Sequence, residues 1–185
     1  MGVEAVEGIV ELGRITGLGD YHIVDEALKA VRETDQSELI ARLLIASGRF
    51  ATSRSDFTLG KSRLNEALAV SHSAKYVPGE AESLASLGLE SIFEGNSAQA
   101  QRQLRRGLAL FEQLGDLRGQ AYCLGPLGYI LLHESEYADY LERAATLFQR
   151  VGEVRGTGRT MLGFGDLAME RSSTFRSLKA CLSRR

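Results

Sequence analysis

The chain has few of the residues on which several protein classes depend. Among 185 residues there are 2 Pro, 3 His, 2 Cys and no Trp. This composition therefore disfavours turn-rich β folds and metal sites built from histidine. Cys123 and Cys181 have no paired spacing, so we expect reduced thiols, each buried as a small hydrophobe, and no disulfide framework.

Long apolar runs are missing as well. No stretch approaches the roughly 18 consecutive apolar residues that span a bilayer. Residues 1–20 hold three acids before Asp20 and a single Arg, without the basic start and apolar core of a secretory signal. We therefore expect a cytoplasmic protein that does not associate with membranes. With 44% apolar residues, 25% charged residues and a net charge of -2, the composition is that of an ordinary globular domain or repeat array.

Two short patterns recur along the chain and alternate with each other. In the first, a glycine follows apolar residues one and four positions before it, as in Leu84, Leu87 and Gly88. The second is a small residue inside an amphipathic run, as at 107–111. The glycines are Gly13, Gly48 (a weaker copy), Gly88, Gly128 and Gly165, and the small residues are Ala27, Ala67, Gly107, Ala144 and Cys181.

The spacing of these patterns predicts stacked helical hairpins. Each small residue precedes the next glycine by 21 residues in all four intervals, whereas the step from glycine to small residue varies between 14 and 19. A helix that docks on the next one at a set angle tolerates no insertion between the contact points, but an exposed turn can change length. We therefore expect an all-α solenoid in which the glycines and small residues mark the helix crossings.

Apolar residues also recur at helical spacing within each unit, and Gly, Asn and Pro stand between the runs. Helices are predicted at 4–18, 20–34, 37–53, 57–74, 79–94, 97–114, 118–134, 136–151, 156–171 and 173–182. They form five hairpins of one domain over residues 1–185, at about 4–35, 36–75, 79–115, 118–152 and 156–182. Pro126 falls inside one helix, where it either kinks the helix or is a tolerated defect.

The hairpin pattern resembles the tetratricopeptide repeat (TPR). In that family, Leu-Gly on the first helix is followed by Gly in the turn and by small, large apolar and small positions on the second helix. The third unit matches with Leu87, Gly88, Gly95, Ala100, Leu104 and Gly107, the second with Gly48, Gly60, Leu64 and Ala67, and the fourth with Leu127, Gly128, Tyr137, Leu141 and Ala144. The period is mostly 40 or 37 rather than the usual 34, and the family's Trp is missing. Repeats of this length, with phrases such as residues 111–119, look like the sensor solenoids of bacterial signal-transduction ATPases and transcription regulators.

The resemblance implies a right-handed α-α superhelix whose concave face, lined by the first helix of each hairpin, binds peptides or partner proteins. The implied groove positions lie six before and one after each glycine: Glu7 and Arg14, Arg42 and Arg49, Glu82 and Leu89, Tyr122 and Tyr129, Arg159 and Asp166. Arginine and tyrosine suit an extended acidic or aromatic peptide. We expect a non-enzymatic scaffold for protein binding in bacterial signalling or transcription regulation; an ordinary solvated helix face is the alternative at each position.

A small-ligand sensor domain, with Tyr122, Pro126 and Tyr129 lining an effector pocket, is the second hypothesis for function. Residues 55–62 end like a phosphate-binding loop, but Ser55 replaces its first glycine and a helix precedes it, so we expect no nucleotide. The three histidines have no ligand partners at helical spacing, so no metal, cofactor or enzymatic activity is expected.

Charge is unevenly distributed along the chain. Residues 1–40 hold nine acidic and three basic side chains, whereas 171–185 hold five basic and no acidic ones. Opposite poles favour head-to-tail self-association through the ends of the array. Nucleic acid is not expected as a partner, because the pI is near 6.0 and no broad basic face with interleaved aromatics is present.

Overall fold

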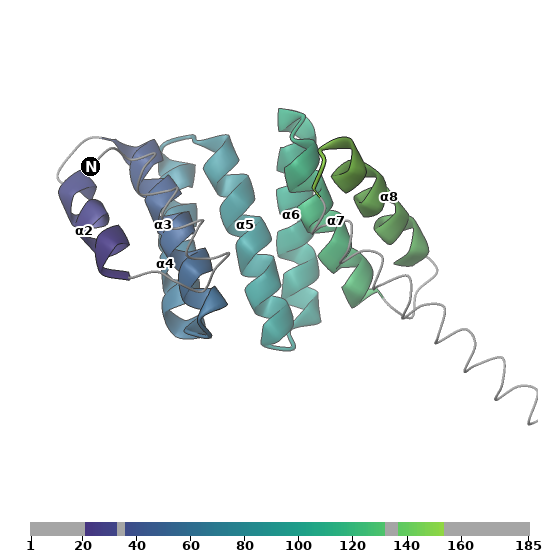
Figure 1. The fold of residues 1–185 in the computed structure, drawn as a ribbon, viewed down its shortest axis with the longest axis horizontal. Helices are drawn as coiled ribbons and strands as arrows, with labels where there is room; N and C mark the ends of the chain where they lie inside the picture. The colour runs from purple at the N-terminus through teal and green to yellow at the C-terminus, as the bar shows by residue number, and fades with distance from the viewer. Residues whose placement is uncertain (1–20, 33–35, 132–136, 154–185) are drawn as a thin grey trace, which may run out of the picture. The chain divides into compact units, whose positions relative to one another are not determined.

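The computed structural model describes residues 21–32, 36–131 and 137–153. In these ranges the regular elements are seven α-helices (Figure 1): α2 (Tyr21–Arg32), α3 (Ser37–Ser53), α4 (Phe57–Ser73), α5 (Val77–Phe93), α6 (Ser97–Leu114), α7 (Leu117–Ile130) and α8 (Tyr137–Arg150). The all-α class and the seven helices predicted between residues 20 and 151 are confirmed, each end within four residues. The helices predicted at 4–18, 156–171 and 173–182 lie outside the described residues.

The chain divides into two compact units, residues 1–115 and 116–185. In the first unit each helix packs on the next in chain order from α2 to α6, and α3 also contacts α5. In the second unit α7 packs on α8 (Figure 1). Helices that pack in chain order are compatible with a helical repeat. The superhelix and the single domain over 1–185 stay predictions.

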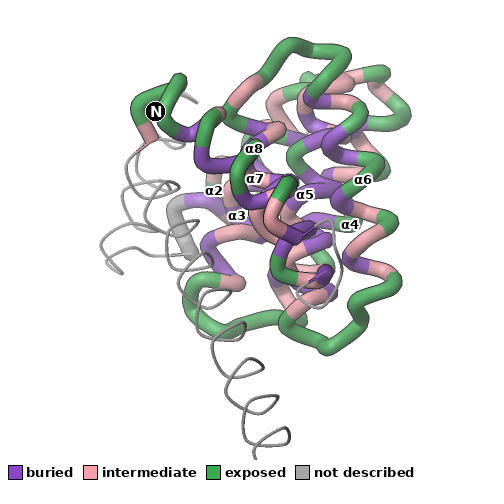
Figure 2. Tube along the Cα trace, turned by 90° about the vertical axis from the view of Figure 1, so that its right-hand side faces the viewer, coloured by how far each residue is buried: buried purple, intermediate pink, exposed green. Residues whose placement is uncertain are grey.

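Burial in the first unit repeats with a period of 40 residues. The order of buried, half-buried and exposed residues along 41–60 is the same, position by position, as along 81–100. Each of these segments contains most of one helix, the turn and the start of the next helix. Figure 2 shows that exposed residues gather on the turns and outer helix sides, while buried residues lie between the helices. The hairpins α3–α4 and α5–α6 are therefore two copies of one packing unit.

Glycines bring the two helices of each hairpin close together. A Cβ atom at Gly48 would lie 2.7 Å from Leu64 Cγ and 3.0 Å from the Gly60 carbonyl oxygen, both on α4. A Cβ atom at Gly88 would lie 2.6 Å from Leu104 Cγ on α6. The closest approach is thus inside each hairpin. The helix that follows each glycine supplies these nearest neighbours. The expected contact between each glycine and the small residue 21 positions earlier stays a prediction.

Pro126 does not interrupt α7, which runs unbroken from Leu117 to Ile130. Proline has no N–H to give to the Tyr122 carbonyl, so the helix tolerates the loss of one internal hydrogen bond. The helix ends at Ile130, four residues before the predicted end. Both interpretations of Pro126, a kink and a tolerated defect, are compatible with this continuous helix.

The glycine crossing makes a prediction about stability. Gly88→Ala should lower the free energy of unfolding by about 1–3 kcal/mol, because the added methyl group overpacks against Leu104. Urea unfolding followed by circular dichroism measures the change. Ser86→Ala, on the outward side of the same helix, is the matched control and should change it by less than about 0.5 kcal/mol. A gain in stability of about 1 kcal/mol in Gly88→Ala, which is the helix-propensity gain without overpacking, would contradict the close approach.

The two turns of the repeat have different residues at one position of positive φ. Gly95 (φ 74°) follows the end of α5, and Ser55 (φ 66°) stands at the equivalent position after α3. The next residue caps the following helix in both copies: Asp56 accepts a hydrogen bond from the Leu59 N–H and Asn96 accepts one from the Gln99 N–H, each at 3.1 Å. The turn geometry is therefore shared, although only one copy has the residue that adopts positive φ without strain.

Ser55→Gly should therefore stabilise the protein by about 0.5–1 kcal/mol, as left-handed backbone costs an L-residue roughly 1–2 kcal/mol and glycine's extra chain entropy offsets part of the gain. The thermal midpoint and urea unfolding give the change. Ser53→Gly, two residues earlier and still helical, should instead destabilise the protein. A loss of stability in both variants would show that Ser55 is not strained.

Candidate functional site

Two parallel stripes of side chains mark the surface of α3 and α5 in the first unit. Their residues recur at steps of four, three and four, which places each stripe along one side of its helix. All are exposed or half-buried, and the residues that flank the first three positions of each stripe are buried. We call these eight residues the outer face: Arg42, Ala46, Arg49 and Ser53 on α3, and Glu82, Ser86, Leu89 and Phe93 on α5. Because α3 contacts α5, the two stripes belong to adjoining helices.

Four of the predicted groove residues come together on the outer face: Arg42, Arg49, Glu82 and Leu89. Arg49 Nη1 lies 3.9 Å from Glu82 Oε2, and the two side chains are 36% and 46% exposed. An ion pair of this length and exposure contributes little to stability. The structure thus pairs an arginine expected to bind a ligand with an acid of the same face, and the charge on the face is mixed rather than purely basic.

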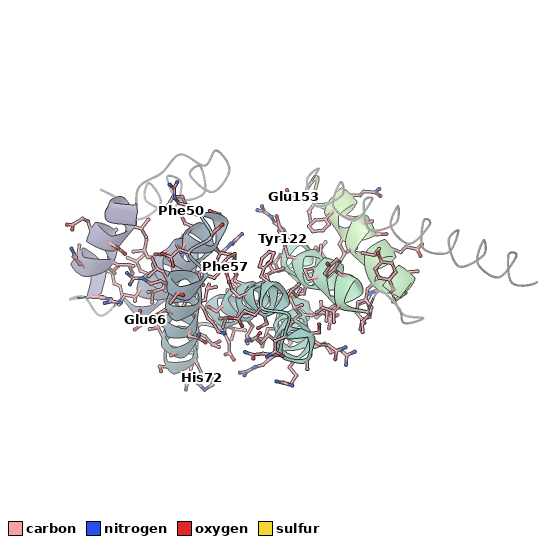
Figure 3. The ribbon with its side chains drawn as sticks, turned by 90° about the horizontal axis from the view of Figure 1, so that it is seen from below. Phe50, Phe57, Glu66, His72, Tyr122 and Glu153 are labelled. Carbon is pink, nitrogen blue, oxygen red and sulfur yellow. The ribbon has the colours of Figure 1, made fainter. Side chains whose placement is uncertain are left out.

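The apolar part of the outer face continues onto the start of α4. Phe93 is 67% exposed, and its ring centroid lies 5.9 Å from that of Phe57, which is 42% exposed. Phe57 begins α4, at the opposite end of that helix from His72 (Figure 3). The two phenylalanines were not predicted as site residues. The signal for Phe93 was its place four residues after Leu89, on the same side of α5.

Glu90 is a buried carboxyl group next to this face. It is only 2% exposed, and its side chain is hydrogen-bonded to the Thr52 hydroxyl of α3. Burial raises the pKa of Glu90, and the charge of Glu94 adds to the rise. The Lys61 ammonium opposes the rise, as does the Thr52 hydroxyl where it donates to the carboxylate. No sequence pattern indicated this burial, because glutamate in an amphipathic helix is ordinarily solvated.

In the second unit, the aromatic residues predicted for the groove are of two kinds. The Tyr122 ring meets Phe148 edge-on, with centroids 5.3 Å apart, and the Arg118 guanidinium lies 5.7 Å from the Tyr122 ring centroid. Arg118 Nη2 also forms an ion pair with Glu153 Oε2, at 3.0 Å. Figure 3 labels Tyr122 and Glu153. Tyr129, by contrast, is 63% exposed. Tyr122 is therefore part of the packing, and Tyr129 is the ring that faces outward.

The residues that were weighed for nucleotide binding or catalysis have structural roles. Lys61, from the segment like a phosphate-binding loop, pairs with both carboxylate oxygens of Glu94 at 2.7 and 2.8 Å. Gly60 faces Gly48 across the hairpin, and Cys123 is fully buried in α7. Over the described ranges, no three His, Cys, Asp or Glu side chains gather closely enough to hold a metal ion.

Several predictions concern residues that the structure does not describe. Arg14, Arg159, Asp166 and the basic segment 171–185 lie outside the described residues. Within the acidic segment, Asp25 pairs with Arg63 at 2.8 Å. Part of the predicted acidic pole is thus neutralised inside the first unit.

Comparison of the chain with protein-family models and with curated proteins finds no match. The TPR resemblance therefore has no support from family membership, and the helical-repeat architecture stands on the packing and burial described above. Among the described helices, none combines the length and the apolar character that crossing a bilayer requires.

The two tyrosines of α7 should differ in their effect on stability. Tyr122→Ala should cost about 1–3 kcal/mol of unfolding free energy, because it removes the edge-on contact with Phe148. Tyr129→Ala, on the same helix, should change it by less than about 0.5 kcal/mol. Chemical unfolding monitored by near-ultraviolet circular dichroism gives both values. If the two substitutions cost the same, Tyr129 is packed rather than outward-facing.

Proposed function

We propose that this protein is a non-enzymatic interaction module with TPR-like repeats, and that its outer face binds an extended acidic peptide segment of a partner protein. The observation that carries the proposal is the register of the face. The same four outward positions recur 40 residues apart on two helices that touch, so one ligand can contact both helices through equivalent sites. Equivalent binding sites at regular intervals on two adjoining helices suit a peptide ligand in an extended conformation, because its side chains also recur at regular intervals.

The chemistry of the face favours carboxylates next to apolar side chains. Arg42 and Arg49 present planar guanidinium groups, which bind carboxylates through two parallel hydrogen bonds. Glu82 lies at the long distance of 3.9 Å from Arg49, so a ligand carboxylate in better geometry can replace it. Leu89 and the exposed ring of Phe93 offer apolar area further along α5.

The proposal extends to the biological role of this peptide binding. The 40-residue spacing and the likeness to repeat regions of bacterial signal-transduction regulators suit an adaptor or sensing role in which partner binding is the activity. Because neither arginine is fully buried, the interaction should be weakened by salt.

The test is selection of peptides from a random phage-displayed library, followed by affinity measurements on the selected peptides. We expect them to be rich in Asp and Glu, and the combined variant Arg42→Glu and Arg49→Glu should bind them at least about tenfold more weakly, a loss of about 1.4 kcal/mol. The reason is the replacement of attraction by like-charge repulsion at both sites.

The matched control is Arg102→Glu combined with Arg105→Glu on the exposed side of α6, which makes the same change in net charge. This control should retain binding, and thermal melts should show that both variants fold. Equal losses in the two variants would mean that net charge, rather than the outer face, attracts the peptide. Selected peptides without acidic residues would contradict the proposed partner chemistry.

A further inference from the structure

Glu90 occupies a repeat position that does not need a carboxyl group. The residue 40 positions earlier is the buried Phe50, and the residue 40 positions later is Ile130, at the end of α7. Within the described residues, both equivalents of Glu90 are therefore apolar, and Phe50 is buried. Burying a carboxyl group costs free energy that an apolar residue would not, so the fold alone gives no reason for Glu90.

The hydrogen bonds around Thr52 indicate which form of Glu90 is present. The Thr52 hydroxyl donates to the Gly48 carbonyl oxygen at 3.0 Å, and the same oxygen atom is hydrogen-bonded to Glu90 Oε1. A hydroxyl has one proton to donate. A carboxylate and a carbonyl are both acceptors, so an ionised Glu90 would compete with Gly48 for that proton. A protonated Glu90 removes the conflict, because it donates to Thr52 while Thr52 donates to Gly48.

We propose that Glu90 carries a proton in the folded protein and closes a hydrogen-bond relay, from Glu90 through Thr52 to the Gly48 carbonyl, that clasps α5 to α3 and opens when the proton is lost. The clasp joins the two helices that carry the outer face, and Thr52 lies one turn from Arg49. Opening it should loosen the register of the two stripes and weaken peptide binding. This regulatory step rests on the proposed function of the outer face; the clasp itself does not.

The charged groups near Glu90 set the pH at which the clasp opens. The Lys61 ammonium on α4 lowers the pKa of Glu90, and the Glu94 carboxylate on α5 raises it. These two groups pair with each other, so each reduces the other's influence. On α6, Arg106 reaches α5 but pairs with Glu80, ten residues before Glu90 and therefore about 15 Å along the helix. On α3, the group that meets Glu90 is the uncharged Thr52 hydroxyl.

The sign of the pH dependence follows from the direction of the shift. Because burial raises the pKa of Glu90, the folded protein holds more protons than the unfolded chain between the ordinary glutamate pKa and the raised one. The unfolding free energy therefore contains a contribution that is fully present below the ordinary value, falls as pH rises through this window and levels off above the folded pKa. Glu90→Gln, which keeps a donor but cannot ionise, should lose this dependence.

The first experiment observes the proton directly in the full chain. Carbon-13 NMR of the glutamate carboxyl groups, with Glu90→Gln to assign the signal, should give Glu90 a titration midpoint above the ordinary glutamate value. Lys61→Met should move that midpoint higher, since it removes the cation and leaves Glu94 unopposed. A midpoint at or below the ordinary value would overturn the clasp.

Two variants of Thr52 test the direction of the relay. Thr52→Val keeps the shape but removes the hydroxyl, so the protonated acid loses its acceptor and the Glu90 midpoint should fall. Thr52→Ser keeps the hydroxyl and should leave the midpoint near that of the parent protein. If the midpoint instead rises in Thr52→Val, Thr52 donates to a carboxylate and the relay is wrong.

The second experiment measures binding of a selected acidic peptide at a pH below and a pH above the Glu90 midpoint. The affinity of the parent protein should fall several-fold across this interval, beyond any change seen for Glu90→Gln, which shares every other titrating group. If the Glu90 midpoint is raised but the peptide affinity of the parent protein and of Glu90→Gln changes equally with pH, the regulation of binding is overturned and the clasp is not. Absence of any binding peptide would reject the proposed function alone, because the NMR titration needs no ligand.

Discussion

The close approach of the two helices in each hairpin is the constraint on which the rest of the first unit depends. At Gly48 and Gly88, side chains of the following helix occupy the space that a Cβ atom would need. Each glycine costs about 1 kcal/mol of helix propensity relative to alanine, and the packing it permits offsets that cost. Because both hairpins cross in this way, they present the same side to solvent, and the outer face follows from that repetition.

Much of the fold was predictable because the signals are local or periodic. Apolar residues at helical spacing predicted the seven described helices, and Gly95, Asn96 and Asp116 marked turns and caps that can be recognised from residue type alone. The glycine contacts were harder to predict. A constant step of 21 residues identifies equivalent positions, but it does not say which of two neighbouring helices lies against the glycine.

The site was less predictable than the fold. The repeat resemblance implied that Arg42, Arg49, Glu82 and Leu89 line one face, and all four belong to the outer face of α3 and α5. The pairing of Arg49 with Glu82 joins residues that are not equivalent in the repeat, and it depends on how far two long side chains reach. Glu90 lies next to Leu89, yet its burial results from the packing of α5 against α3 and α4, which no local pattern reports.

A mixed face and a buried acid have related consequences for recognition. A purely basic face would attract any acidic chain at low salt. In the proposed module, Arg49 is paired with Glu82 and would bind only a ligand carboxylate whose geometry improves on 3.9 Å. That comparison requires α3 and α5 to hold a fixed register, since a shift of an ångström changes the distances on which it depends. A hydrogen bond between Thr52 and a neutral Glu90 fixes the register without placing a second negative charge near the arginines. In the proposed module, the selectivity of the outer face therefore depends on the protonation of Glu90, because the hydrogen bond between Thr52 and neutral Glu90 holds α3 and α5 in register.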